Sequence, residues 1–203
     1  MPKGMPKAFV YVDGQNLYYA AKAAFGYSTP NYDVRKLSKE VCRTNQWLLG
    51  DIHFYTGVPS VRRNAHWHNF WAARMRVMRG DDIKVISHPL RYQTVYEDGQ
   101  ELHVPREKGI DVRLALDATK SMMSGACDVV VIFSQDQDFV EIAKEARHIQ
   151  TDTGRRIVVA SVYPYGENSP NPRGIDTTKW IKIPRQTYDK CLDERDYFLS
   201  HHS

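Results

Sequence analysis

One apolar run limits the folds that this chain can adopt. Residues 129–133 are all β-branched or aromatic, which is typical of a strand that is buried on both faces of a parallel sheet. Two carboxylates, Asp136 and Asp138, follow the run, and apolar residues then recur at helical spacing from Ile142 to Ile149. We therefore expect a strand, a turn that carries two aspartates, and a helix, as in α/β proteins.

Two explanations account for the aspartate pair. Like charges this close repel each other, and a bound cation is the usual reason to keep them together. The alternative is a structural role, because Asp138 precedes Glu141 by three residues, which is the spacing of a helix capping box. The pair alone does not separate these explanations, and the rest of the chain has to do so.

A second stretch repeats this arrangement near the start of the chain. Residues 8–12 predict another buried strand, and Asp13, Gly14 and Asn16 follow it before a helix expected over residues 17–25. Gly14 permits a tight turn and a close approach to a ligand, while Asn16 offers a neutral amide. An ordinary helix N-cap is the alternative role for Asn16.

Strands and helices alternate through the rest of the chain. Further helices are expected at residues 33–43, 61–79 and 109–122, and further strands at 51–58, 83–86 and 156–162. In the helix at 61–79 the arginines, Arg74 among them, are expected mainly on a solvated face. The alternation predicts one α/β domain whose mostly parallel sheet has helices on both faces.

Three segments lie outside this alternation. Residues 91–104 predict a hairpin around Asp98-Gly99, and its tyrosines and basic residues suit either a nucleic-acid strand or plain solvent exposure. Residues 163–178 are rich in Pro, Gly and Asn and predict a loop that is mobile or covers the site. A short edge strand at 180–183 and a weak terminal helix at 186–199 complete the chain.

Composition narrows the functional classes. The 203 residues carry 28 Lys and Arg against 24 Asp and Glu, and this net charge of +4 permits a polyanionic partner without requiring one. No apolar run approaches the roughly 18 residues of a membrane span, so we expect a soluble, cytoplasmic protein with no membrane partner. Three cysteines without paired spacing argue against a disulfide framework or structural zinc. His66 and His68 point about 200° apart on a helix and cannot share a metal ion.

Four aspartates are expected at one edge of the sheet. Three of them follow strands, and the fourth lies in the first turn of a helix that can start at the same edge. Such an oxygen-rich site suits Mg²⁺ or Mn²⁺ better than zinc, and convergence explains the pattern better than four separate helix caps. The expected set is Asp13, Asp111, Asp136 and Asp138, with Asn16 and Ser134 as neutral ligands or positioning groups. Asp117 lies about 240° around the helix from Asp111 and is expected outside the site.

This set predicts a type of reaction. Aspartates without a nucleophilic Ser or Cys paired to a His suit metal-assisted hydrolysis of a phosphodiester, in which the metal activates water and stabilises the transition state. No phosphate-cradling Gly-rich loop is present, so we expect no nucleotide cofactor. The residues expected to bind substrate are Ser134, Lys108, Arg62 and Arg63, because basic side chains at this edge can contact phosphates.

Three motifs occur in a characteristic order: residues 9–17 (FVYVDGQNL), 108–117 (KGIDVRLALD) and 130–139 (VVIFSQDQDF). Together they resemble the NYN domain, the LabA-like branch of the PIN-like nuclease superfamily. The resemblance implies a three-layer α/β/α sandwich with a five-stranded sheet in the order 3-2-1-4-5, and a divalent-metal-dependent ribonuclease. By motif position it implies that the catalytic metal ligands are Asp13, Asp111, Asp136 and Asp138, with Asn16 in support.

The resemblance also implies boundaries and partners. Residues 8–162 would form the nuclease domain, with the hairpin at about 91–104 inserted, and residues 163–203 a C-terminal extension. RNA would be the partner, and a homodimer is possible. The family commonly has small residues at positions 135 and 137, so Gln135 and Gln137 are expected to narrow the site or contact the substrate.

The leading hypothesis is therefore an endonuclease that acts on structured or single-stranded RNA. A second hypothesis is a PIN-like module that binds RNA or a protein with little or no catalysis, and the presence of all four aspartates favours the enzyme. A phosphatase of the haloacid dehalogenase type is disfavoured because the first strand lacks its second carboxylate. A topoisomerase-primase fold is disfavoured because it needs Glu where Asp13 stands.

Overall fold

The computed structural model describes residues 4–97, 100–106 and 109–198, and a parallel sheet forms its centre. Six strands pair in the order β3-β2-β1-β6-β7-β8, and every neighbouring pair is parallel. The strands are β1 (Lys7–Asp13), β2 (Leu48–Val58), β3 (Ile83–Pro89), β6 (Val129–Phe133), β7 (Val158–Pro164) and β8 (Lys179–Ile183). The predicted order of the first five strands is confirmed. The edge strand expected at 180–183 is confirmed as β8, and because it pairs with the outer edge of β7 the sheet has six strands and not the five that the resemblance implies.

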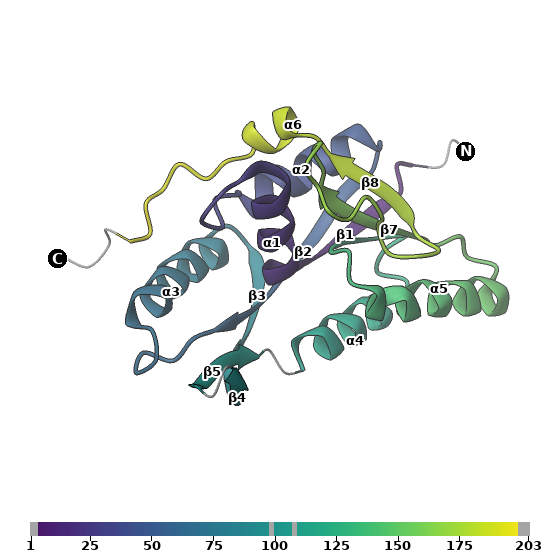
Figure 1. The fold of residues 1–203 in the computed structure, drawn as a ribbon. Coiled ribbons are helices and arrows are strands. Elements are labelled where there is room, and N and C mark those ends of the chain that lie inside the picture. The colour runs from purple at the N-terminus through teal and green to yellow at the C-terminus, as the bar shows by residue number, and fades with distance from the viewer. Residues whose placement is uncertain (1–3, 98–99, 107–108, 199–203) are drawn as a thin grey trace.

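Helices cover both faces of the sheet (Figure 1). One face carries α1 (Gly14–Phe25), α2 (Val34–Thr44), α3 (Ala65–Gly80) and the short α6 (Arg185–Asp189). The other face carries α4 (Ile110–Met123) and α5 (Val140–Thr153), which follows the 3₁₀ turn η1 (Gln137–Phe139). The predicted three-layer α/β/α sandwich is confirmed.

Alternate residues of the central strands supply two separate cores. In β1, Val10 and Val12 pack with α1, α2 and α3, whereas Phe9 and Tyr11 pack with α4 and α5. In β6 all five residues are buried, because helices cover both faces of this central strand. An unbroken apolar run therefore indicates a strand in the middle of the sheet. An alternating pattern would indicate a strand with one solvated face.

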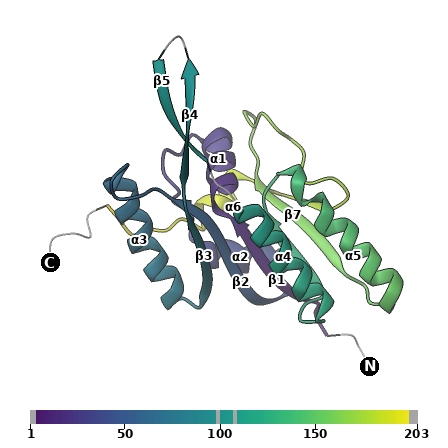
Figure 2. The same cartoon turned by 90° about the horizontal axis from the view of Figure 1, so that it is seen from below.

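A two-stranded hairpin projects from the body of the protein (Figure 2). It consists of β4 (Arg91–Glu97) and β5 (Gln100–Arg106), which pair antiparallel with each other. Along the chain the hairpin comes between β3 and α4. The predicted hairpin is confirmed. Asp98 and Gly99, on which the prediction of its turn depends, lie outside the described residues.

Arg74 of α3 is completely buried, so its predicted place on a solvated face is wrong. Its guanidinium carbon lies 4.6 Å from the centre of the Tyr32 ring and 5.7 Å from that of Trp71, and the group donates a hydrogen bond to the Tyr32 carbonyl. Position 74 shares the helical spacing of the buried Trp71 and Met78. Aromatic rings therefore surround the charge in place of water.

The predicted terminal helix over 186–199 is also wrong, because α6 ends at Asp189. The backbone after it pairs with residues 31–33: the Asp33 N–H donates to the Cys191 carbonyl at 2.8 Å, and the Asp193 N–H donates to the Asn31 carbonyl at 2.8 Å. These bonds take the place of helical ones. All three cysteines are free and buried. Among the described residues no helix has the length and apolar character to cross a membrane.

Candidate active site

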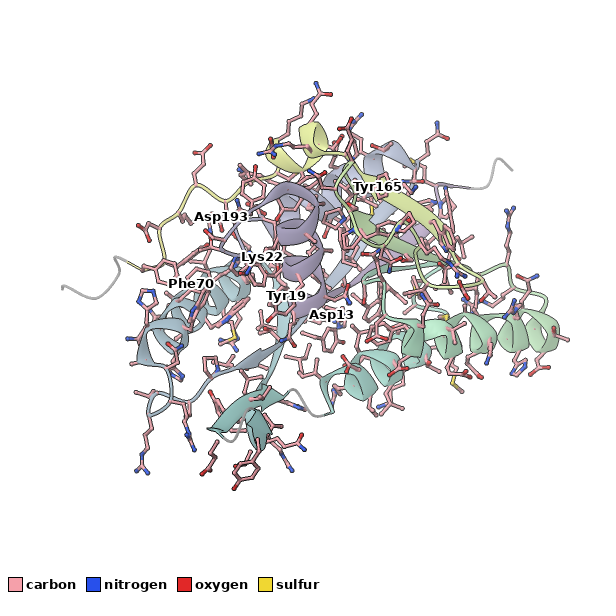
Figure 3. All side chains as sticks on the ribbon, in the orientation of Figure 1. Asp13, Tyr19, Lys22, Phe70, Tyr165 and Asp193 are labelled. Carbon is pink, nitrogen blue, oxygen red and sulfur yellow. The ribbon has the colours of Figure 1, made fainter. Side chains whose placement is uncertain are left out.

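Asp13 ends β1 and also caps α1. Its carboxylate is 5% exposed; Oδ1 accepts a hydrogen bond from the Asn16 N–H at 3.0 Å, and Oδ2 accepts one from the Ser134 hydroxyl at 3.2 Å. Ser134 follows β6, which lies beside β1 in parallel register, so the two strand ends meet. Figure 3 marks Asp13 at the start of α1.

Gly14 and Asn16 complete this turn. A Cβ atom on Gly14 would lie 2.5 Å from Cζ of Phe54 and 2.9 Å from the Tyr55 carbonyl oxygen, so the close contact between α1 and β2 requires glycine. The Asn16 side chain is not an N-cap, because its Oδ1 accepts a hydrogen bond from the Gln135 N–H at 3.0 Å. Asn16 therefore joins α1 to the loop that carries the aspartate pair.

Asp136 and Asp138 take different places in that loop. Asp136 caps η1 by accepting a hydrogen bond from the Asp138 N–H at 3.0 Å, and its own N–H donates to the Ser134 hydroxyl at 3.1 Å. Asp138 is exposed, and α5 begins after Phe139 without a side-chain cap. The capping explanation therefore holds for Asp136 but not for Asp138.

Asp111 lies in the first turn of α4, and this helix packs against η1, which contains Asp138. The helix starts after Gly109, whose positive φ of 82° favours glycine. Burial raises the pKa of Asp111, and the negative charges of Asp136 and Asp138 raise it further. The three carboxylates are therefore close enough to repel one another.

These residues suit a divalent cation by their donor chemistry. In the part of the chain that the structure describes, no three Asp, Glu, His or Cys side chains come together closely enough to hold a metal ion. The candidate donors are all oxygen atoms. The charges of Asp136 and Asp138 add to burial in raising the pKa of Asp111, and a cation would offset those charges. Mg²⁺ commonly binds through one or two carboxylates and keeps several waters, so it does not require three protein ligands.

Gln135 and Gln137 contact the loop after β7, which sequence reasoning did not anticipate. Nε2 of Gln135 donates to the Arg173 carbonyl at 2.6 Å. Nε2 of Gln137 donates to the Gly174 carbonyl at 3.0 Å, and Oε1 of Gln137 accepts from the Asp176 N–H at 3.0 Å. The two side chains therefore hold residues 171–176 beside the candidate site by hydrogen bonds. In the sequence, the only indication of this role is that both residues are bulky at positions where the family commonly has small ones.

The residues expected to bind substrate differ in their exposure to solvent. Arg62 and Arg63 are exposed in the turn before α3, and the Arg63 guanidinium lies 5.1 Å from the centre of the Tyr92 ring. Ser134 is 1% exposed, and its hydroxyl contacts Asp13 and Asp136. Lys108 lies outside the described residues.

Asp117 lies away from the aspartate pair. It accepts hydrogen bonds from the Tyr55 hydroxyl at 3.0 Å and from Nε of Arg113 at 2.8 Å. Burial alone would raise the pKa of Asp117, but these two hydrogen bonds outweigh burial and the pKa is lowered. The Arg113 side chain on α4 and the Tyr55 hydroxyl on β2 stabilise the charge of this carboxylate without a metal ion.

A cavity of about 410 Å³ adjoins the turn at Gly14, and we call it the aromatic cavity. Sequence reasoning missed it because its walls come from separate segments of the chain. It is lined by Gly14, Gln15, Tyr18, Tyr19, Pro30, Thr56, Gly57, Pro59, Arg63, Asn64, Trp67, Trp71, Leu90 and Tyr92. Clustered aromatics at residues 18–19 and 67–71 were a signal, but their spacing also fits an ordinary core.

Comparisons with known proteins place the chain in a family. The family model described as NYN domain matches residues 7–172. A solved structure of a protein of unknown function from Vibrio parahaemolyticus is similar, with a TM-score of 0.54, 20% identity, and coverage of 90% of this chain and 96% of that chain. At this identity the likeness shows the fold alone.

A second solved structure, MurG from Acinetobacter baumannii, has a TM-score of 0.33 and 10% identity over 88% of this chain and 46% of that chain, which is too weak a likeness to support an argument. The comparison with curated proteins gives no match. The family model covers most of the chain, including the strand ends that carry Asp13 and the aspartate pair. The chain therefore belongs to the NYN domain family, within the PIN-like superfamily.

Proposed function

We propose that the protein is a divalent-metal-dependent ribonuclease that cleaves within RNA chains. Proteins of the NYN family are generally nucleases, which supports a hydrolase that acts on nucleic acid. The observation that carries the proposal is that α4, whose first turn carries Asp111, packs against η1, which contains Asp138. Burial raises the pKa of Asp111, and the nearby charges of Asp136 and Asp138 raise it further. Helix capping accounts for Asp136 but gives no reason to hold two further carboxylates near it, whereas a cation site does.

In this proposal Asp111, Asp136 and Asp138 hold Mg²⁺ or Mn²⁺ together with Asp13. When bound, the cation supplies Lewis acidity toward the phosphate and offsets its negative charge. Ser134 holds Asp13 and Asp136 in fixed relation through its hydroxyl, and Asn16 holds the loop at Gln135. The first of these hydrogen bonds orients the Asp13 carboxylate and the other two hold the backbone of the aspartate loop, and such preorganisation favours catalysis.

The proposed reaction is hydrolysis of a phosphodiester. A water oxygen forms a bond to phosphorus, the bond from phosphorus to one ribose oxygen breaks, and one proton of the water ends on that leaving oxygen. Arg62 and Arg63 are exposed before α3 and are proposed to contact neighbouring phosphates, as is Lys108. The carboxylates are thus assigned to the reacting phosphate and the basic residues to the rest of the RNA backbone.

The test is cleavage of an end-labelled single-stranded RNA in Mn²⁺. We expect cleavage by the unaltered protein, none in EDTA, and a rate at least about 100-fold lower for Asp136→Asn. Asp152→Asn, an exposed aspartate at the far end of α5, is the matched control and should cleave at the unaltered rate. Equal cleavage by the unaltered protein and Asp136→Asn, or by neither, would overturn the proposal.

One observation favours a second candidate, a PIN-like module that binds RNA or a protein with little catalysis. Within residues 4–97, 100–106 and 109–198, no three potential ligands come together into a metal-binding group. This candidate predicts that labelled RNA is retained by the protein but stays intact in both Mg²⁺ and Mn²⁺.

A homodimer stays a prediction, which light scattering at several protein concentrations would test.

A further inference from the structure

The aromatic cavity lies beside the proposed catalytic centre. Gly14 and Gln15, which follow Asp13 directly, form one wall, and Thr56 and Gly57 at the end of β2 form another. Asp13 pairs with Tyr55 in the register of β1 and β2, so the cavity lies on the β2 side of Asp13. Because Ser134 joins Asp13 to the end of β6, the aspartate pair lies on the opposite side of Asp13.

Aromatic side chains from three elements line the cavity. Tyr18 and Tyr19 come from α1, Trp67 and Trp71 from α3, and Tyr92 from β4. Aromatic side chains stack on the unpaired bases of single-stranded RNA, whatever the base. The volume of about 410 Å³ is near the lower end of small-molecule sites, which span roughly 300–1,000 Å³, and it suits one base better than a paired duplex.

The charge of the cavity suits a base that is joined to a phosphate. Arg63 is the only charged residue among the described residues that line the cavity, and it makes no ion pair with any of the residues that the structure describes. Its guanidinium lies against the Tyr92 ring, 5.1 Å from the ring centre, and can reach a phosphate at the rim. Gln15 and Asn64 add neutral amides that can bond to the edge of a base.

Tyr19 lies between the aromatic cavity and a second hollow. It is 54% exposed and lines both the aromatic cavity and a second hollow of about 340 Å³. Asn16 and Gln135 line that second hollow, and they are the residues that join α1 to the aspartate loop. Figure 3 shows Tyr19 on α1 near Asp13. A strand that leaves the aromatic cavity over Tyr19 therefore passes the ends of β1 and β6.

We propose that the aromatic cavity holds one unstacked base of a single-stranded RNA and so places a neighbouring phosphate at the aspartates. This inference rests on the proposed ribonuclease function and adds the form of the substrate: an unpaired segment is required. Base-paired RNA cannot supply the base without unpairing it, so a duplex is expected to bind without using the cavity.

The test is a double-mutant cycle between the RNA and the cavity. The full chain in EDTA is titrated with a fluorescein-labelled ten-nucleotide RNA, and separately with a backbone of equal length that lacks all bases. Both are measured with the unaltered protein and with the Tyr19→Ala, Tyr92→Ala double variant. Neither tyrosine is among the buried residues, and circular dichroism checks that the variant is folded. Tyr27→Ala, outside the cavity, is the matched control.

We expect the double variant to bind the RNA at least about 10-fold more weakly and the base-free backbone with unchanged affinity. Tyr27→Ala should weaken neither. An equal loss for both oligomers, no loss for either, or no binding of the RNA by the unaltered protein would overturn the cavity proposal. Cleavage is scored separately. If RNA is bound through its bases but is never cut in Mn²⁺, the ribonuclease proposal is overturned and the cavity proposal stands. If RNA is cut but its binding does not depend on its bases, the cavity proposal is overturned and the ribonuclease proposal stands.

Discussion

The hydroxyl of Ser134 donates a hydrogen bond to Oδ2 of Asp13 at 3.2 Å, although 121 positions separate the two residues. The same hydroxyl accepts a hydrogen bond from the Asp136 N–H at 3.1 Å. One buried hydroxyl therefore links the carboxylate of Asp13 at the end of β1 to the backbone of Asp136 after β6. This relation is possible because β1 and β6 are adjacent and parallel.

Removing this hydroxyl should weaken metal binding. Ser134→Ala leaves the Asp13 and Asp136 groups without their shared partner, so we expect the Mn²⁺ concentration for half-maximal RNA cleavage to rise by about 10-fold. The free energy of unfolding should fall by about 1 to 3 kcal/mol. Ser38→Ala is the control, because Ser38 is also buried and donates to the Val34 carbonyl. If both variants need the unaltered amount of Mn²⁺, Ser134 has only a structural role.

Gln137 should hold the loop after β7 in place. Its side chain bonds to the Gly174 carbonyl and the Asp176 N–H, so Gln137→Ala should speed hydrogen exchange at the Asp176 amide by at least about 10-fold. Gln150→Ala, an exposed glutamine of α5, should leave that rate unchanged. Unchanged exchange in Gln137→Ala would show that other contacts hold the loop.

Asp117 should make stability depend on pH. Its hydrogen bonds lower its pKa in the folded state, so its stabilising contribution is complete above the unfolded pKa of about 3.9 and is lost as pH falls through the folded value. Asp117→Asn should therefore lower the free energy of unfolding by about 1 to 2 kcal/mol at pH 6 and by less at pH 3. Urea denaturation at both pH values measures this. The same difference at both pH values would contradict it.

Arg63 should contribute one phosphate contact. Affinity for single-stranded RNA falls with salt at a slope of about 0.7 per contact, so Arg63→Ala should reduce the slope of log affinity against log salt by about that amount. Arg156→Ala removes an exposed arginine at the opposite end of the sheet, just before β7, and should leave the slope unchanged. Equal slopes for the unaltered protein and Arg63→Ala would remove Arg63 from the proposed interface.

The sequence predicts the sheet well because burial leaves a local signal. Residues 129–133 form β6 as expected, and the predicted order of the first five strands is correct. The edge strand expected at 180–183 forms β8, but the count of five strands that the resemblance implies leaves it out of the sheet. Local patterns therefore identify the strands, whereas the number of strands in one sheet depends on which of them pair.

Long-range contacts explain what the sequence did not predict. Arg74 is buried because aromatic residues from other segments, Tyr32 and Tyr197 among them, surround its guanidinium. The residues after α6 stay irregular because their backbone pairs with residues 31–33. Gln135 and Gln137 contact a loop about 36 to 39 positions away. None of these partners can be read from spacing, whereas the strand-end position of Asp13 can.

The most direct test of the metal centre is the anomalous scattering of manganese in crystals soaked with Mn²⁺. We expect one or two peaks between Asp111 and the aspartate pair, with carboxylate oxygens of Asp136 and at least one other aspartate within about 2.3 Å of the metal. Crystals of Asp136→Asn should lose them. A fully soaked crystal without a peak among Asp13, Asp111, Asp136 and Asp138 would contradict the metal centre on which the proposed function depends.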